Sequence, residues 1–150
     1  MITLDTISLF LDKNVPIAFS GVSRNTKKYS SQMFLDLEKN GYQVIPVNPF
    51  MSEVGNKKCY NSVTELPSGI EKLIVCNNKK DTDKIVEEAI NKGIKQIWIQ
   101  QMSETKSAIE KAQAAGIKVI SRECVYMFAM PTGIHGFHKS IKKFFGALPK

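Results

Sequence analysis

Five short apolar runs, separated mostly by stretches with helical periodicity, constrain the fold of this 150-residue chain more than any other feature. The first run, residues 15–19, is continuously apolar rather than alternating, which is typical of a parallel strand buried on both faces. Parallel strands joined through helices require right-handed crossovers. The sequence therefore predicts an α/β, Rossmann-like open parallel sheet of about five strands with helices on both faces. The predicted strands are residues 15–19, 43–47, 72–76, 96–99 and 117–120.

Apolar residues that recur at helical spacing predict the helices. The first covers residues 3–13 with Thr3 or Asp5 as its cap, and the second covers residues 30–40 with Gly41 directly after it. Residues 50–69 are expected to be irregular apart from one helical turn at 62–66. The two remaining helices are bounded, in chain order, by Asp81 or Thr82 and Gly93, and by Ser103 or Glu104 and Gly116.

The length, and the absence of an internal repeat or a low-complexity linker, predict a single domain over residues 1–150. Its core is expected at about residues 9–124, followed by an extension at 125–150. Residues 134–148 have apolar positions at helical spacing opposite lysines, which predicts an added C-terminal amphipathic helix. This helix could dock on the sheet or join two copies in a homodimer. An anionic membrane surface is the less favoured alternative.

The formal net charge of +7 favours an anionic partner, such as a phosphorylated ligand. No block of five basic residues occurs and the aromatic residues are not interleaved with them, which argues against nucleic acid. No apolar run approaches membrane-spanning length and the N-terminus lacks a basic leader, so a cytoplasmic location is expected. Three widely spaced cysteines suggest reduced thiols rather than disulfides or a metal knuckle.

The turn after the first predicted strand is the candidate ligand-binding element. In doubly wound sheets the ligand lies beyond the carboxyl ends of the strands, where the strand order reverses. Gly21 would let the backbone approach a phosphate, and the N–H groups and dipole of the following helix would attract it. Arg24, Lys27 and Lys28 would add positive charge. The ends of the other strands, at 47–49, 76–80 and 100–103, are expected around the same crevice.

A nicotinamide dinucleotide fits this turn poorly. The G-x-G-x-x-G fingerprint would require glycines where Ser23 and Thr26 stand, and the turn is not a P-loop either. The second predicted strand ends in Asn48-Pro49, without the acidic residue that binds the ribose 2′-hydroxyl of NAD. A Tyr-x-x-x-Lys proton-transfer pair is also missing. These features make a nicotinamide-dependent oxidoreductase the alternative rather than the first hypothesis.

The sequence contains the segments SGVSRN (20–25), KY (28–29), GYQVIPVNP (41–49), GNKKCY (55–60) and IWIQ (97–100). With these segments the chain resembles the small stand-alone CoA-binding domains, whose fold is similar to the nucleotide-binding domain of the succinyl-CoA synthetase α-subunit. The resemblance covers about residues 9–124. It implies coenzyme A binding, with the diphosphate at the turn Gly21–Arg24 and the adenosine near Val47–Pro49 and Lys57-Lys58. A lysine would favour the 3′-phosphate that an aspartate would repel.

The function expected from these observations is the binding of coenzyme A or an acyl-CoA by a non-catalytic module. A nicotinamide-dependent oxidoreductase and a structural or regulatory domain that has lost its ligand stay open. No metal ligands are predicted, and Cys124 is interpreted as a partly buried thiol rather than a nucleophile, because no histidine is near it in sequence. A Gly21→Val variant is expected to lose ligand binding and keep native secondary structure. The predicted cofactor-binding residues are Ser20, Gly21, Val22, Ser23, Arg24, Lys28, Val47, Asn48, Pro49, Lys57, Lys58, Cys76 and Gln100.

Overall fold

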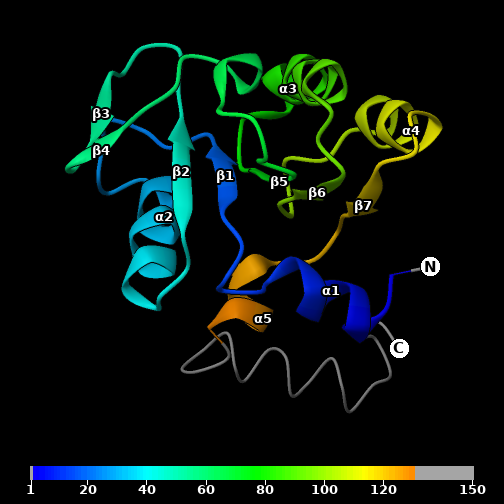
Figure 1. The fold of residues 1–150 in the computed structure, drawn as a ribbon, viewed down its shortest axis with the longest axis horizontal. Helices are drawn as coiled ribbons and strands as arrows, with labels where there is room; N and C mark the ends of the chain where they lie inside the picture. Colours follow the sequence, from blue (N-terminus) through cyan, green and yellow to red (C-terminus); the bar gives the residue numbers. More distant parts are fainter. Residues whose placement is uncertain (1, 131–150) are drawn as a thin grey trace.

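The computed structural model describes residues 2–130, which form an open, five-stranded parallel sheet (Figure 1). The strand order is β2-β1-β5-β6-β7 and every neighbouring pair is parallel. This confirms the predicted Rossmann-like α/β sheet. The strands are β1 (Ile17–Ser20), β2 (Val44–Val47), β5 (Lys72–Val75), β6 (Gln96–Ile99) and β7 (Lys118–Ile120).

Helices cover both faces of the sheet, as predicted (Figure 1). Along β1, Ile17 and Phe19 pack into one core with α1, α2 and α5, whereas Ala18 packs into the other core with α3 and α4. Successive side chains of a strand point to opposite faces, so a strand covered on both sides must be apolar throughout. The helices are α1 (Leu4–Phe10), α2 (Tyr29–Lys39), α3 (Lys79–Lys92), α4 (Lys106–Ala114) and α5 (Val125–Ala129).

Two helices begin elsewhere than predicted. Helix α3 begins three residues before Thr82, after Asn78. The Thr82 hydroxyl donates to the carbonyl of Ser103 at 2.7 Å, so Thr82 ties the helix to a neighbouring loop instead of capping it. Helix α4 begins after Thr105, whose hydroxyl oxygen accepts from the Ala108 N–H at 3.0 Å. The predicted cap Thr3 of α1 is confirmed, with its hydroxyl accepting from the Thr6 N–H.

A small hairpin, β3 (Glu53–Val54) and β4 (Lys57–Lys58), lies where the sequence predicted irregular structure. Each strand has two residues, too few for a recognisable period. The predicted helical turn in this region is confirmed as the 3₁₀ helix η1 (Val63–Glu65). Between the hairpin and η1, the chain covers the outer edge of β2, since the Tyr60 N–H donates to the carbonyl of Pro46 at 3.0 Å.

The predicted C-terminal amphipathic helix falls in residues 131–150, outside the part of the chain that the structure describes. Between residues 2 and 130, none of the helices has the length and apolar character needed to cross a bilayer.

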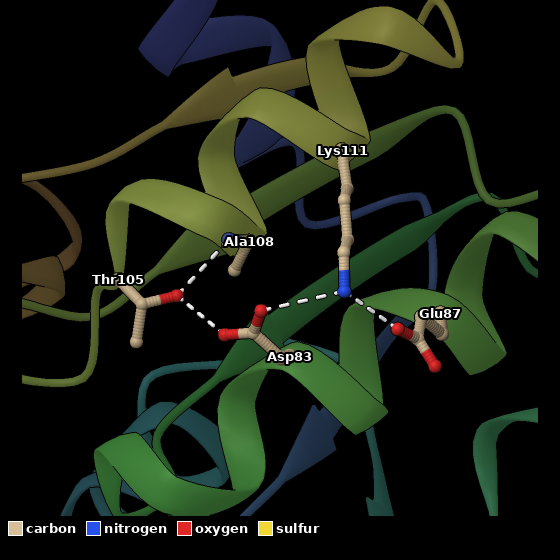
Figure 2. Close-up of polar contacts among 5 residues, drawn as sticks. All are labelled: Asp83, Glu87, Thr105, Ala108 and Lys111. Atoms are coloured by element: carbon tan, nitrogen blue, oxygen red, sulfur yellow. Dashed lines mark hydrogen bonds and ion pairs between the residues drawn. The ribbon is translucent and has the colours of Figure 1, made fainter.

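A polar cluster fastens α3 to α4 (Figure 2). The Asp83 carboxylate accepts from the Thr105 hydroxyl at 2.6 Å and lies 3.5 Å from the Lys111 ammonium, which is also 2.6 Å from Glu87. Hydrogen bonds from Ser107 and Thr105 lower the pKa of Asp83, and Lys111 lowers it further. Asp83 therefore stabilises the fold in its ionised form.

Replacing Asp83 with alanine should lower the free energy of unfolding by about 1 kcal/mol at neutral pH, mainly through the lost hydrogen bonds. Because the pKa of Asp83 is lower in the folded protein than its ordinary value of 3.8, this stabilisation is fully present above pH 3.8. It is lost as the pH falls through the lower pKa of the folded state. Urea unfolding at a series of pH values would measure it. Glu110→Ala is the control, because its exposed pair with Lys106 should contribute almost nothing. An Asp83→Ala effect no larger than the control would contradict the prediction.

Candidate functional site

A cleft of about 550 Å³ lies at the carboxyl ends of β1, β2 and β5. The chain passes from β1 outward to β2, and from β5 outward through β6 to β7, so the strand order reverses between β1 and β5. Open α/β sheets bind their ligands at such a reversal, because the loops on either side diverge there. The cleft is therefore the candidate binding site of this fold.

Most of the predicted binding residues lie together in this cleft. Ser20 at the end of β1 pairs in register with Val47 of β2 and Val75 of β5, so the loops that follow the three strands begin at one level. The predicted residues that line the cleft are Ser20, Gly21, Val22, Ser23, Lys28, Val47, Asn48, Pro49 and Cys76.

Gly21 lets the turn after β1 pass against the backbone that follows β5. Its φ is +109°, and a Cβ built there would lie 2.2 Å from the carbonyl oxygen of Cys76. The next residues are held by a side chain of α2: the Ser31 hydroxyl accepts from the Ser23 N–H at 3.0 Å and donates to the Ser23 carbonyl at 2.9 Å. A side chain at Gly21 would therefore require the two loops to move apart.

Asn48 ties the end of β2 to the same turn. Its amide nitrogen donates to the carbonyl of Val22 at 2.6 Å, and its amide oxygen accepts from the Phe50 N–H at 2.7 Å. The guanidinium of Arg24 donates to the carbonyl of Phe50, the residue that Asn48 also binds. Arg24 does not line the cleft. Asn48 and Arg24 therefore shape the rim of the cleft.

The two lysines of β4 do not line the cleft. The Lys57 ammonium is 2.7 Å from the Glu38 carboxylate and donates to the carbonyl of Val44 at 2.9 Å. The Lys58 ammonium lies 4.9 Å from the ring centre of Tyr60. Lys57 therefore contacts the backbone of β2, and Lys58 contacts the ring of Tyr60.

Gln100 is buried and belongs to a hydrogen-bonded cluster that does not line the cleft. Its amide nitrogen donates to the Cys124 sulfur at 3.2 Å and to the Tyr29 hydroxyl at 3.3 Å, and its amide oxygen accepts from the Val125 N–H at 3.0 Å. The Tyr29 hydroxyl is 3.2 Å from the same sulfur. The cluster joins the end of β6 to the starts of α2 and α5.

Cys76 has its thiol between this cluster and the cleft. Burial, and to a smaller extent the neighbouring Cys124, raises the pKa of Cys76 to about 12. Burial, followed by the hydrogen bond to Cys124, also raises the pKa of Tyr29 well above its usual range. At neutral pH Cys76 is a protonated thiol, which is a poor nucleophile.

Several cleft residues were missing from the predicted set. Phe50 lines the cleft and is 76% exposed, although only its position after Asn48-Pro49 marked it in the sequence. Asn77 follows Cys76, and its amide oxygen is buried without a hydrogen-bond partner among the described residues. The cleft is also lined by charged residues of α3. A helical pattern alone predicts that these side chains face solvent. These are Asp81, Lys84 and Glu88.

Two helices begin at the cleft without a side-chain cap. The N-cap residues of α2 and α3, Lys28 and Asn78, both line the cleft and neither makes a capping hydrogen bond. In contrast, Thr3 and Thr105 cap the helices α1 and α4, whose N-termini lie outside the lining of the cleft. The uncapped first-turn N–H groups and the helix dipoles make this end of the sheet attractive to anions.

The chain belongs to the CoA binding domain family, whose profile matches residues 16–129. This confirms the resemblance found in the sequence. Within residues 2–130, no cluster of three or more acidic, histidine or cysteine side chains could hold a metal ion.

Similar proteins include both large ligase subunits and small proteins. The chain is 32% identical over 120 residues to the α-subunit of an ADP-forming acetate–CoA ligase II of Pyrococcus furiosus, and the match spans 73% of this chain but 26% of that subunit. It is 25% identical to the uncharacterized protein YneT of Bacillus subtilis, over 79% of this chain and 88% of YneT. The solved structure of a hypothetical protein from Pyrococcus horikoshii OT3 has a TM-score of 0.76 at 34% identity, covering 83% of this chain and 87% of that one.

Gly21→Ala should lower the free energy of unfolding by about 3 kcal/mol, because a Cβ would meet the Cys76 carbonyl and the positive φ is strained for any other residue. Gly55→Ala is the matched control: its φ is +60° and nothing lies within 4 Å of a built Cβ, so about 1 kcal/mol is expected. Denaturant unfolding of both variants measures the difference. Equal losses at the two positions would contradict the close contact at Gly21.

Proposed function

We propose that this protein binds coenzyme A or an acyl-CoA in the cleft as a non-catalytic module. The observation that carries the proposal is the cleft between two helix N-termini that lack side-chain caps, in a chain that belongs to the CoA binding domain family. The diphosphate of the ligand would accept hydrogen bonds from the first-turn N–H groups of α2, beside the turn at Gly21.

Lysines in and beside the cleft support an anionic ligand. Lys28 and Lys84 line it, together with the carboxylates of Asp81 and Glu88. Lys79 and Lys80 occupy the first turn of α3, where the helix dipole disfavours cations, so their placement does not serve the stability of the helix. A phosphate at this end of the sheet would compensate that cost. Of the two lining carboxylates, Glu88 is engaged with the Val63 N–H at 3.0 Å.

The rim made by residues 47–50 offers an apolar surface for the adenine base. Val47 and Pro49 line the cleft beside the exposed ring of Phe50. An aromatic side chain on a rigid rim can stack on a base, and the carbonyl of Phe50 is held by Arg24 while its N–H is held by Asn48. We therefore assign the adenine to this rim.

The same geometry disfavours a nicotinamide dinucleotide. The residue at the end of β2 is Asn48, whose amide is engaged with Val22 and Phe50 and presents no carboxylate to a ribose diol. The protonated thiol of Cys76 supplies no nucleophile at neutral pH. The first observation argues against NAD, and the second argues against Cys76 as a nucleophile.

The ligase activity of the Pyrococcus furiosus relative is not carried over with the proposal. The matched segment accounts for 26% of that subunit, so the comparison supports a shared ligand-binding domain. The match to the smaller protein YneT, which spans 88% of that protein, supports the domain as a module that occurs without the rest of a ligase subunit.

Isothermal titration with coenzyme A, dephospho-CoA, NAD and ADP tests the proposal. Coenzyme A should bind with micromolar affinity, and its affinity should fall with added salt because phosphates provide most of the attraction. NAD should bind at least about 100-fold more weakly, a difference of roughly 2.7 kcal/mol. Tighter binding of NAD, or no heat from coenzyme A at millimolar concentration, would refute the assignment.

Phe50→Ala should weaken coenzyme A binding about 10-fold, because stacking on one base contributes roughly 1–3 kcal/mol. Phe50→Trp should retain the affinity. Leu9→Ala is the control, since Leu9 is 63% exposed on α1 and does not line the cleft. Titration of the three variants with coenzyme A and with 4′-phosphopantetheine, which keeps a phosphate but lacks the adenosine, separates the contribution of the base from that of the rest of the ligand. Equal weakening for both ligands would contradict a role for Phe50 in base binding.

A further inference from the structure

Among residues 2–130, the sheet has an open edge at β7. The other edge, at β2, is covered, because the Tyr60 N–H donates to the carbonyl of Pro46 and the Tyr60 carbonyl accepts from the Asn48 N–H. No described strand pairs with the outer side of β7, which lies at the end of the sheet between α1 and α4 (Figure 1). An open edge of this kind presents unpaired backbone groups to which another strand can bind.

The outward-facing backbone groups of β7 belong to Val119. The Lys118 N–H donates to the carbonyl of Lys95 at 3.0 Å, so Lys118 directs its backbone groups toward β6. Alternate residues of a strand direct their backbone groups to the same neighbour, so Ile120 also faces β6 and Val119 faces away from it. An added antiparallel strand would exchange two hydrogen bonds with Val119, as in β-augmentation.

A hollow of about 580 Å³, which we call the edge hollow, lies along this edge and has a wall on each face of the sheet. Ile2 and Thr6 line it on the α1 side, and Ile109 and Ile117 line it on the α4 side. The side chain of Val119 packs into the same core as these last two isoleucines. A side chain opposite Val119 on an added strand would therefore lie against the α4 wall, and the next side chain would lie on the other face.

The charged residues that line the edge hollow are both basic. They are Lys118 and Arg122, which are exposed and form no ion pair with another described residue. The carboxylates of Asp5, Glu110 and Glu123 lie outside the lining. Alternation along β7 places the Lys118 side chain on the α1 face. The edge hollow thus offers isoleucines to one face of an added strand and a cation to the other.

We propose that the β7 edge binds an extended segment of another protein in which apolar and acidic residues alternate. The segment adds an antiparallel strand beside Val119, with its apolar side chains against the α4 wall and its carboxylates toward Lys118 and Arg122. A second copy of this chain is disfavoured as the occupant, because its own β7 would bring the same two cations to the edge. The edge hollow shares no lining residue with the cleft, so the proposal does not depend on the ligand.

Titration of the full chain with a fluorescently labelled peptide, Val-Glu-Val-Glu-Val-Glu-Val, tests the proposal. In the proposed pairing the valine N–H groups of the peptide face β7, whereas its glutamate N–H groups face solvent. N-methylation of the valines should weaken binding at least about 10-fold, because it removes the hydrogen bonds to β7. N-methylation of the glutamates should leave the affinity nearly unchanged. A peptide with lysine in place of each glutamate should bind at least about 10-fold more weakly, because its charges repel the two cations.

Variants of the protein test the same contacts from the other side. Lys118→Glu should weaken binding of the Val-Glu peptide about 10-fold by placing like charges together. Lys39→Glu is the matched control, because it makes the same change of charge on α2 and Lys39 does not line the edge hollow. Val119→Pro should also weaken binding about 10-fold through the lost N–H, while far-UV circular dichroism stays native, since a strand tolerates proline where its N–H faces solvent.

The proposal is overturned if the two N-methylated peptides bind equally well, or if Lys118→Glu has no larger effect than Lys39→Glu. Absence of binding to the Val-Glu peptide at millimolar concentration would also overturn it. A dimer in sedimentation that Val119→Pro dissociates would assign the edge to a second copy and overturn it as well.

Discussion

The close passage of the Gly21 backbone against the end of β5 is the constraint on which the candidate site depends. At this point the turn after β1 runs within contact of the Cys76 carbonyl, in a conformation that a Cβ would prevent. The two loops then diverge, one toward α2 and the other toward α3. Helix α3 begins three residues after Cys76 and helix α2 eight residues after Gly21, and the uncapped N-termini of both helices lie at one cleft. A wider separation of the loops would place the two helix ends too far apart to share a ligand.

Most of the polar side chains around the cleft bind other groups of the protein and hold its loops in place, rather than being available to a ligand. Ser31 fixes the turn through both backbone groups of Ser23, and Asn48 joins that turn to the residue Phe50. Gln100 does the same outside the lining of the cleft, where it joins three elements. The surface left for a ligand consists of backbone N–H groups, helix dipoles, lysines and an apolar rim. Such fixed donors need little reorganisation when they bind a phosphate.

The sheet and its helices could be predicted from the sequence because strands buried on both faces must be apolar throughout and helices repeat every 3.6 residues. The hairpin β3–β4 could not, since strands of two residues have no period. The start of α3 was misplaced because Asp81 and Thr82 are typical capping residues, whereas Asn78 precedes the helix without using its side chain. The Thr82 hydroxyl is engaged with Ser103, a residue that only the packing of α3 brings near.

The sequence by itself determined the order of strands and helices along the chain and which residues follow each strand. Local periodicity and the positions of glycines specify these features. That was enough to place the turn at Gly21, the Val47–Pro49 segment and Cys76 around one cleft. Only the tertiary structure decided which side chains remain available there. Lys57 pairs with Glu38 and Gln100 bonds to Tyr29 and Cys124, partners that are 19, 71 and 24 positions away in the chain. A side chain's partners depend on which elements pack together, and no local pattern in the sequence records them.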